Sequence, residues 1–388
     1  MKKLLLVANV SKEHIRKFHI PFILRMKELG WRVDVACRLD EPVPECDNAY
    51  DLPCDRNPFR GGLSKSVKLL QQVIQQNRYD LICCNTITGS IVARLSARSF
   101  RPQGLKVIYI DHGLHFFKGA PAHRWIMGYP MEKALAPLTD VMVTINSVDY
   151  ATARTYLGIK NVERIHGIGV DLQRFRECRL SSVEWLQKRR SLGLSGEDFI
   201  MTYVAEIIDN KNQQLLLQLL ELILPAIPNA KLMLIGPEHD GGKTRAMVQK
   251  QGLSDRVLLT GWRDDIPHLL RISDVYTASS KSEGLPLNLI EAMACDLPVV
   301  ACKNRGHSEI ILHGENGFLV EQGDSAAMAA RVFQLAKDPS LKQKIVHQAQ
   351  LDIAQYETTH VLDELTEIMN RYVKQDRLTY EKTPLSDP

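Results

Sequence analysis

The chain has 388 residues, of which 45% are hydrophobic and 24% are charged, a composition typical of a globular protein long enough for two domains. Its formal net charge is +4, and residues 1–172 carry 24 Lys and Arg against 16 Asp and Glu, so the first half is basic. No apolar run approaches the ~20 residues of a membrane-spanning helix, and the apolar start lacks the pattern of a signal peptide, so a cytoplasmic protein is expected rather than an integral membrane protein.

Short apolar runs alternate with amphipathic stretches in the first half of the chain. The apolar runs predict strands at 4–8, 33–37, 81–84, 107–110 and 141–145. Helices are predicted between them, among them 18–29 and 63–76. Continuously apolar strands separated by helices indicate a parallel sheet that is covered on both faces.

The same alternation starts again near residue 200. Strands are predicted at 200–204, 232–235, 257–259, 275–278 and 299–301. Helices are predicted at 212–224, 244–251, 266–272 and 287–295. Two successive sets of strand–helix units predict an α/β fold with two Rossmann-like domains. Because ligands bind at the carboxyl ends of such strands, we expect the two sheets to face each other across an interdomain cleft.

The turn residues Gly167, Gly169 and Asp171 place the domain boundary near residue 170. We expect an N-terminal domain over 1–170 and a C-terminal domain over 171–357. A helix over 358–378 is expected to pack back on one of them, and the N-terminal domain is favoured. The polar end at 379–388 contains two prolines and is expected to be a flexible tail.

The eight cysteines agree with a reducing compartment. None forms a C-x-x-C pair, and none alternates with histidine at the spacing of zinc ligands. Several lie in apolar segments, where a reduced thiol behaves as a small hydrophobic side chain. We therefore expect free thiols and no metal site, and a catalytic cysteine is the less favoured alternative.

The strongest functional pattern is the segment SEGLPLNLIEAMA at 282–294, which directly follows the strand predicted at 275–278. Gly284 permits a tight turn, and Pro286 suits the first turn of a helix, which should begin near Leu287. The first N–H groups of a helix have no partner within it. Those of Leu287, Asn288 and Leu289, together with the helix dipole, predict a site for an anion such as a diphosphate.

Two glutamates flank this anion site. Glu283 lies in the loop before the helix, and Glu291 lies about one turn inside it. One can accept hydrogen bonds from the hydroxyls of a hexose and the other from those of a ribose. A helix-capping acid beside an unrelated surface glutamate is the alternative, and the ordered combination of strand, Glu, Gly, Pro, helix and Glu makes it the weaker interpretation.

Glu283 and Glu291 are separated by seven residues, and the second is followed by Ala-Met-Ala and by LPVVA at 297–301. This pattern resembles the E-x7-E signature of the retaining glycosyltransferases of family 4, which have the GT-B fold. Further similar segments occur along nearly the whole chain, namely GIGVD at 167–171, GWRDDI at 261–266, GHSEII at 306–311 and GENGFLV at 314–320. The segments FHIP at 18–21 and DHGLHFFKGAP at 111–121 resemble the bacterial capsule and exopolysaccharide branch.

The resemblance implies transfer of a sugar from a nucleotide-sugar donor with retention of the anomeric configuration. It implies that Glu283 contacts the donor hexose and that Glu291 contacts the ribose. Lys211 matches the family's phosphate-binding lysine, and His112 matches its N-domain histidine beside the donor sugar, with His115 as a less favoured substitute. The candidate catalytic residues are His112 and Glu283. The candidate donor-binding residues are Lys211, Arg263, Glu283, Gly284, Leu287, Asn288, Leu289 and Glu291.

Two positions depart from the family's pattern. Five residues before the lysine, the family often has an arginine that completes a clamp on the diphosphate, and this chain has Glu206. A carboxylate cannot neutralise a diphosphate, so either Arg263 or the helix N-terminus compensates, or Glu206 contacts a sugar hydroxyl. The segment 9–12, predicted as the first loop, lacks the paired glycines that are common there, and its role is left open.

No D-x-D triplet occurs in the chain, and metal-dependent transferases use that spacing to hold a divalent cation on the diphosphate. We therefore expect a reaction that needs no metal and no cofactor, catalysed by positioning and by stabilisation of the leaving diphosphate. The resemblance implies attack on the same face of the sugar, with the departing phosphate helping to take the acceptor's proton and no protein nucleophile.

The resemblance implies a growing polysaccharide or a polyprenyl-diphosphate sugar as the acceptor, and it favours a UDP-activated N-acetylhexosamine or hexose as the donor. The aromatic and basic segment 116–138 suits a membrane interface, whereas its apolar face favours a core helix of the first domain. The basic first half favours peripheral contact with an anionic membrane, against the alternative of an ordinary solvated surface. No nucleic-acid partner is expected.

Three other functions are weaker alternatives. A nucleotide-sugar epimerase shares the fold but lacks this glutamate pair. A catalytically silent nucleotide-sugar-binding subunit is left open by Glu206. A dehydrogenase would need G-x-G-x-x-G after the first strand, and no glycine occurs between that strand and Gly30.

Overall fold

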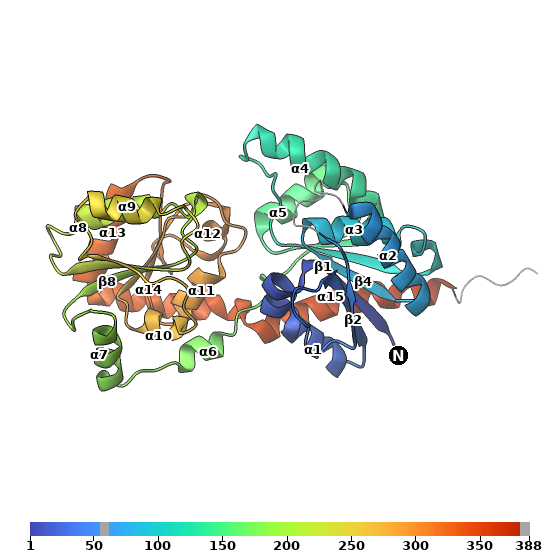
Figure 1. Cartoon of the computed structure of the whole chain (residues 1–388), viewed down its shortest axis with the longest axis horizontal. Coiled ribbons are helices and arrows are strands. Elements are labelled where there is room, and N and C mark those ends of the chain that lie inside the picture. The colour runs from blue at the N-terminus through green and yellow to red at the C-terminus, as the bar shows by residue number, and fades with distance from the viewer. Residues whose placement is uncertain (55–61, 381–388) are drawn as a thin grey trace, which may run out of the picture. The chain divides into compact units, whose positions relative to one another are not determined.

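The computed structural model describes residues 1–54 and 62–380, and the chain divides into two compact units (Figure 1). Unit 1 comprises Met1–Gly169 and Thr358–Pro388, and unit 2 comprises Val170–Glu357. Each unit contains one parallel sheet with helices on both faces. The prediction of an α/β fold with two Rossmann-like domains is therefore confirmed.

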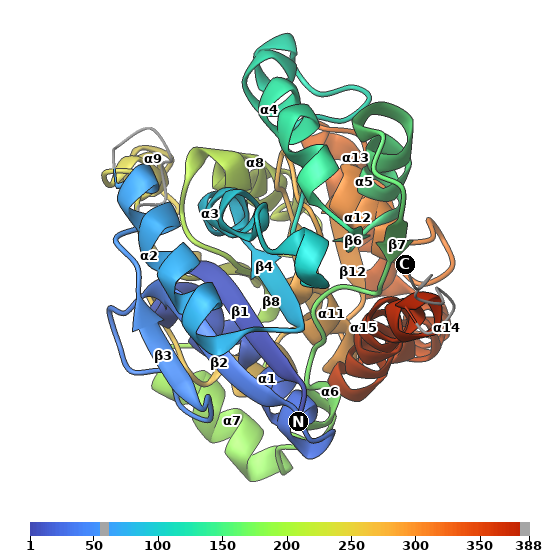
Figure 2. The same cartoon turned by 90° about the vertical axis from the view of Figure 1, so that its right-hand side faces the viewer.

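The sheet of unit 1 has, within the described residues, seven parallel strands in the order β3-β2-β1-β4-β5-β6-β7. They are β1 (Lys3–Val10), β2 (Arg32–Arg38), β3 (Asn48–Asp51), β4 (Leu81–Asn85), β5 (Lys106–Asp111), β6 (Val141–Thr144) and β7 (Val162–Arg164). Figure 2 shows β3, β2, β1 and β4 side by side. The strand order reverses between β1 and β4, which are neighbours in the sheet although β2 and β3 separate them in the chain.

The helices of unit 1 cover both faces of this sheet. They are α1 (Ile20–Glu28), α2 (Leu63–Asn77), α3 (Ile87–Ala97), α4 (Ala122–Leu135), α5 (Ser147–Thr152) and α15 (Thr358–Tyr380). Figure 1 shows α2 and α3 on one side of the sheet and α1 and α15 on the other. Leu5 and Val7 of β1 pack with Leu70 of α2 and Val92 of α3 in one buried cluster. The alternation of side chains along a strand sends the residues between them to the opposite face.

The first crossover differs from the prediction. The sequence predicts a loop at 9–12, which is wrong, and a helix at 18–29, which is present with a start two residues later. β1 continues to Val10, a π-helical segment η1 (Ser11–His19) follows at once, and α1 begins at Ile20. Ser11 Oγ donates to Asp40 Oδ1 at 2.5 Å, and the backbone N–H of Lys12 donates to the same carboxylate. These long-range bonds fix the start of η1 where local sequence gives no signal.

The C-terminal helix α15 belongs to unit 1. His166 Nδ1 lies 2.7 Å from Glu364 Oε1, and Arg25 pairs with Asp363 at 2.6 Å. The helix continues to Tyr380, so the start of the expected tail at 379 is too early. The rest of that prediction, residues 381–388, lies outside the described residues.

The sheet of unit 2 has the order β10-β9-β8-β11-β12-β13, with six parallel strands among the described residues. They are β8 (Phe199–Val204), β9 (Ala230–Ile235), β10 (Val257–Leu259), β11 (Val275–Ala278), β12 (Val299–Cys302) and β13 (Phe318–Val320). The helices are α6 (Leu172–Glu177), α7 (Ser182–Ser191), α8 (Gln213–Ile223), α9 (Lys243–Lys250), α10 (Ile266–Arg271), α11 (Leu287–Ala294), α12 (Arg305–Ile310), α13 (Ser325–Lys337) and α14 (Pro339–Asp352). The order reverses between β8 and β11, as in doubly wound nucleotide-binding sheets.

Candidate active site

The carboxyl edge of the unit 2 sheet holds most of the predicted donor residues. In open α/β sheets, ligands bind where the strand order reverses, which here is between β8 and β11. Lys211 lies in the connection after β8, and Glu283 lies in the loop between β11 and α11. The two strands that flank the switch point therefore each supply one of the predicted side chains.

Lys211 and Glu283 form an ion pair in unit 2. Their Nζ and Oε1 atoms are 2.5 Å apart, and both side chains are largely buried, with 20% and 14% exposed. The two loops are also joined by Asn210 Nδ2, which donates to the carbonyl of Ser282 at 3.0 Å, and by Ser279 Oγ, which donates to the carbonyl of Lys211 at 2.7 Å. These hydrogen bonds fix the two loops relative to each other, so the position of the ion pair does not depend on its flexible side chains alone.

Helix α11 begins at Leu287 with Pro286 as its N-cap residue, as predicted. The N–H of Leu289 is turned back on the carbonyl of Pro286 at 3.2 Å, whereas the N–H groups of Leu287 and Asn288 make no hydrogen bond among the described residues. The side chain of Asn288 donates to the carbonyl of Val204 at 2.6 Å, which ties the helix start to the end of β8. Two free N–H groups and the positive end of the helix remain for an anion.

Helix α12 packs closely against Glu283, a role that the sequence analysis did not assign. A Cβ added to Gly306 would lie 2.7 Å from the Cβ of Glu283 and 3.0 Å from its carbonyl carbon, so only glycine allows this approach. Arg305 Nε donates to the carbonyl of Glu283 at 3.1 Å. The signal was present in the GHSEII segment, but the sequence does not show which residue that glycine faces.

Glu291 lies on the second turn of α11, as predicted. Burial raises the pKa of its carboxyl to about 7, and the nearby Arg174 guanidinium opposes this shift. At neutral pH the group is therefore divided between its neutral and ionised forms. A carboxyl in this state can both donate and accept hydrogen bonds with a diol.

Arg263 is engaged within its own loop. Its Nε and Nη2 atoms donate to the two carboxylate oxygens of Asp265 at 2.8 and 2.7 Å, and Lys188 of α7 also pairs with Asp265. These hydrogen bonds from Arg263 and Lys188 hold the pKa of Asp265 well below its usual range. Glu206 is exposed, and its carbonyl accepts a hydrogen bond from Gln213 Nε2 at 2.9 Å. Arg263 therefore compensates for Glu206 only if a ligand competes with Asp265.

His112 directly follows β5 at the carboxyl edge of the unit 1 sheet. Its Nε2 lies 2.9 Å from Oδ1 of Asn85, the last residue of β4. Burial lowers the pKa of His112 to about 4, so its ring is neutral at physiological pH. The alternative candidate His115 is exposed. The role of His112 beside the donor sugar stays a prediction.

Two further histidines, to which the sequence analysis assigned no role, lie against His112. The ring of His14 is 5.1 Å from that of His112, and the ring of His19 is 5.9 Å from it, both edge to face. Burial also lowers the pKa of His14, and that of His19 to about 3. Among the described residues, this trio and the group His166, His360 and Glu364 have the geometry to hold a metal ion.

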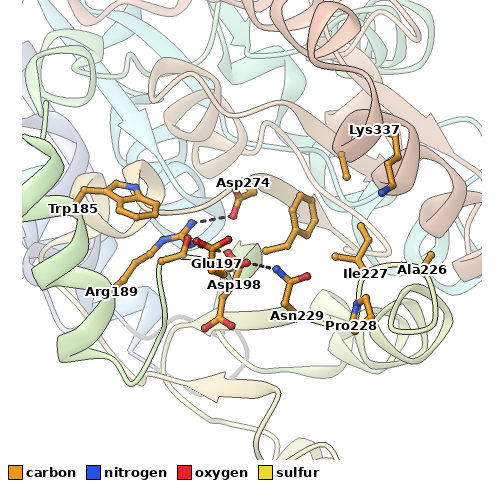
Figure 3. A pocket seen from close by; sticks show the side chains of 13 residues that line it. Trp185, Arg189, Glu197, Asp198, Ala226, Ile227, Pro228, Asn229, Asp274 and Lys337 are labelled. Carbon is orange, nitrogen blue, oxygen red and sulfur yellow. Dashed lines mark hydrogen bonds and ion pairs between the residues drawn. The ribbon is translucent and has the colours of Figure 1, made fainter.

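A separate pocket of about 410 Å³ in unit 2 lies at the opposite edge of the sheet (Figure 3). It is lined by Phe199 at the amino end of β8 and by Asp274 just before β11. Arg189 also lines the pocket and is only 2% exposed. Its guanidinium already donates hydrogen bonds to the carbonyls of Ile272 and Asp198 and to the carboxylate of Asp274. Because these N–H groups are already hydrogen-bonded, the pocket does not provide the predicted binding site for the nucleotide sugar.

All eight cysteines are described and free, and six of them are buried, including Cys83, Cys84 and Cys302. Burial raises the pKa of each of these three thiols, and that of Cys302 reaches about 11. The predicted free thiols are therefore confirmed. Such raised pKa values are those of unreactive structural cysteines.

Comparisons with known proteins agree with this architecture. Residues 22–174 match the family model described as Glycosyltransferase Family 4, and residues 186–352 match the one described as Glycosyl transferases group 1. The chain is 38% identical over 386 residues to EpsD of Bacillus subtilis (strain 168), which carries a provisional glycosyltransferase name, and the match covers 98% of this chain and 99% of EpsD. The fold and these matches define a glycosyltransferase of the GT-B type. The chain belongs to glycosyltransferase family 4.

Two further proteins illustrate the range of the family. The chain is 25% identical over 283 residues to the UDP-Gal:α-D-GlcNAc-diphosphoundecaprenol α-1,3-galactosyltransferase of Escherichia coli, with 71% of each chain covered. The crystal structure of HepE of Anabaena in complex with UDP and glucose matches with a TM-score of 0.75 at 21% identity, over 96% of this chain and 100% of that chain. This last likeness shows the fold. No helix in the described part of the chain is long and apolar enough to cross a bilayer.

Proposed function

We propose that this glycosyltransferase transfers a hexose or N-acetylhexosamine from a UDP-sugar to a growing polysaccharide or a polyprenyl-diphosphate sugar, with retention of configuration and without a metal ion. The observation that carries the proposal is the Lys211–Glu283 ion pair beside the free N–H groups at the start of α11. Both lie at the switch point of a nucleotide-binding sheet.

The ion pair between Lys211 and Glu283 can exchange for contacts with the donor. In the structure, the Lys211 ammonium is neutralised by Glu283 at 2.5 Å. A diphosphate brings two or more negative charges and draws Lys211 to itself, which frees the Glu283 carboxylate to accept hydrogen bonds from the hexose hydroxyls. The N–H groups of Leu287 and Asn288 add fixed donors that need no reorganisation as the leaving diphosphate gains charge. Glu291 is assigned to the ribose, and Gly284 and Leu289 shape the loop and the helix start around the phosphates.

His112 is assigned to the donor sugar. Because burial keeps its ring neutral, it can donate one hydrogen bond and accept another, but it does not add a positive charge that would oppose an oxocarbenium-like transition state. Attack by the acceptor on the same face as the leaving diphosphate lets a phosphate oxygen take the acceptor's proton. This assignment needs no protein nucleophile.

The names of the relatives support the choice of donor and acceptor. The E. coli enzyme uses a UDP-sugar and a diphosphoundecaprenol-linked acceptor, and the HepE complex contains UDP. A lipid-linked acceptor requires contact with the inner face of the membrane. Helix α4 (Ala122–Leu135) is suited to it, because Ile126 and Met127 are 74% and 70% exposed. α4 therefore has both a packed side, on which Trp125 and Tyr129 contact Phe116, and an exposed apolar turn.

A donor screen tests the proposed function. Purified protein is incubated with UDP-, GDP- and ADP-sugars, with and without EDTA, and both thermal shift and release of the nucleotide are measured. We expect one preferred UDP-sugar and the same turnover with the chelator. Binding without turnover would instead identify a silent subunit, and loss of turnover in EDTA would contradict the metal-free reaction.

Two variants test the site. Glu283→Gln and Lys211→Ala should each lower kcat/KM by at least about 100-fold, the usual cost of removing one electrostatic contact to the transition state. Lys231→Ala is the matched control, because Lys231 is a half-buried lysine that lies 3.7 Å from Asp198 at the amino edge of the same sheet. If both site variants kept rates near that of the control, the site assignment would be wrong.

A further inference from the structure

Three histidine side chains converge at the carboxyl edge of the unit 1 sheet. His14 and His19 come from η1, and His112 follows β5. One ring nitrogen from each lies within 4.8 Å of the corresponding atoms of the other two, and the Nε2 atoms of His14 and His19 are only 3.1 Å apart. Ligand atoms about 2.0–2.1 Å from a tetrahedral zinc are spaced about 3.3 Å apart, so this pair already matches one edge of such a site.

The helical form of η1 is what brings His14 and His19 together. In an α-helix with 3.6 residues per turn, residues five apart point about 140° away from each other. The wider π turn, with its i→i+5 hydrogen bonds, returns residue i+5 to nearly the same face. A nine-residue π-helical segment is long for a form that usually occurs as a single turn, and such segments concentrate at functional sites. The π-helical conformation therefore places His14 and His19 on the same face, which a regular α-helix would not do.

The hydrogen bond between the Nε2 atoms of His14 and His19 brings together two ring nitrogens that can also bind a metal ion. A neutral imidazole has one nitrogen lone pair with which it can bind a metal ion. In the tautomer in which His112 Nε2 donates to Asn85 Oδ1 at 2.9 Å, the lone pair of that ring is on Nδ1. A hydrogen bond from the second ring nitrogen to a fixed oxygen is how metal-binding histidines are usually oriented. The trio contains no carboxylate, so it does not suit Mg²⁺ or Mn²⁺, which prefer oxygen ligands.

We propose that His14, His19 and His112 bind one divalent transition-metal ion of the Zn²⁺ class through three imidazole nitrogens, with the fourth position open to water. Neither the proposed transfer reaction nor the fold depends on this ion. Its consequence follows from the position of His112. If His112 acts on the donor sugar, which is the part that rests on the proposed function, an ion bound to its ring withdraws it from that role. Occupancy of the site then inhibits transfer reversibly.

Metal binding itself is measured without reference to activity. The chelator-treated full-length protein is titrated with Zn²⁺ by calorimetry and with Co²⁺ by visible absorption, which reports a four-coordinate site. We expect one ion per chain and no comparable binding of Mg²⁺. His14→Gln and His19→Gln should each weaken binding by at least about tenfold, because removal even of an outer-shell partner costs 10- to 100-fold. Circular dichroism checks that each variant is folded.

The second histidine group provides the matched control. His360→Ala removes an exposed ligand from the group of His166, His360 and Glu364 and should leave the binding unchanged. If the ion were lost in His360→Ala and kept in His14→Gln, the site would be at the other group and the proposal would be overturned. Equal binding of Mg²⁺ and Zn²⁺ by the wild type would overturn it as well, even if the variants failed to fold.

Inhibition is tested on the wild type with its preferred donor. Stoichiometric Zn²⁺ should abolish transfer, excess EDTA should restore it, and Mg²⁺ should have no effect. One bound Zn²⁺ with full activity would overturn the inhibitory link while the binding data stand on their own. Absence of any transfer under all conditions would count against the proposed function, and the calorimetric result would still decide the metal site.

Discussion

Arg94 is a fully buried charge in unit 1 and is paired with a single carboxylate. Its side chain is fully buried, its guanidinium stacks 4.5 Å from the centre of the Tyr109 ring, and two of its nitrogens bond Glu132 at 2.8 and 3.1 Å. This pair joins α3 to α4. Together with the packing of Trp125 and Tyr129 on Phe116, the pair positions the exposed side chains of α4.

Removal of the carboxylate should therefore be costly. Glu132→Ala leaves a buried guanidinium without its counter-charge, and we expect a loss of about 3–5 kcal/mol in the free energy of unfolding. Glu28→Ala is the control, because Glu28 is 67% exposed and lies 3.7 Å from Arg25, and such a pair contributes about 0–1 kcal/mol. Urea unfolding of both variants provides the comparison, and similar losses in the two would contradict this account.

The carboxyl of Glu291 predicts a pH dependence of donor binding. Its pKa is raised to about 7 by burial, so its ionised fraction falls about tenfold between pH 8 and pH 6. If ribose binding needs the carboxylate as acceptor, the KM for the donor should rise by a similar factor over this range. Glu291→Gln should remove the pH dependence, whereas Glu321→Gln, at an exposed position in unit 2, should keep it. A pH-independent KM in the wild type would exclude this role.

The raised pKa of Glu291 also predicts how the free energy of unfolding changes with pH. The folded protein binds the Glu291 proton more tightly than the unfolded chain does, whose value is near 4.5. The contribution of this group to stability is therefore lost as the pH rises from about 4.5 to 7. The Glu291→Gln variant should lack this part of the pH dependence of unfolding.

At the scale of elements, the loop between β11 and α11 is positioned by the packing of α12. Gly306→Ala would place a methyl carbon 2.7 Å from the Cβ of Glu283, so the loop or α12 must shift. We expect kcat/KM to fall about 10- to 100-fold, because a displacement of about 1 Å at a reacting group can cost 100-fold. Gly196→Ala is the control, since its nearest neighbour, Leu186 Cδ1, would be at an ordinary 3.5 Å. Equal activity of the two variants would mean that α12 does not position Glu283.

Elements with a strong local signal are the ones the sequence predicts. The apolar run at 275–278 and the start of α11 at Leu287 match the structure because burial and Pro286 act within a few residues. β3 is short and mostly exposed, so its hydrophobic pattern is weak, and β13 has only three residues, too few to show a period. η1 depends on bonds from Ser11 to Asp40 and Glu41, which the local sequence does not reveal. The histidine cluster was missed for the same reason, since it needs both the π turn and the distant His112.

At the scale of the whole molecule, charge is divided between the two units. Unit 1, including α15 and the C-terminal residues, contains 28 Lys and Arg against 21 Asp and Glu, whereas unit 2 contains 21 against 24. The excess of positive charge therefore belongs to the unit that also exposes Ile126 and Met127 on α4. Anionic lipid attracts the positive charge over several ångströms, and the acyl region of the membrane accepts the two exposed apolar side chains.

These two features predict binding to anionic vesicles with two separable contributions. We expect the wild type to sediment with vesicles that contain phosphatidylglycerol and not with neutral ones, and rising salt should weaken the binding because the Debye length shrinks. A double change, Ile126→Asp with Met127→Asp, should reduce binding at low salt by at least about tenfold, since burial of one such side chain contributes about 1.5–3 kcal/mol and 1.4 kcal/mol is tenfold. Leu351→Asp is the matched control, because Leu351 is 59% exposed on α14 of unit 2. Binding that is lost equally in the control, or that persists in the double variant, would show that α4 is not the contact and that a lipid-linked acceptor must reach the enzyme by another surface.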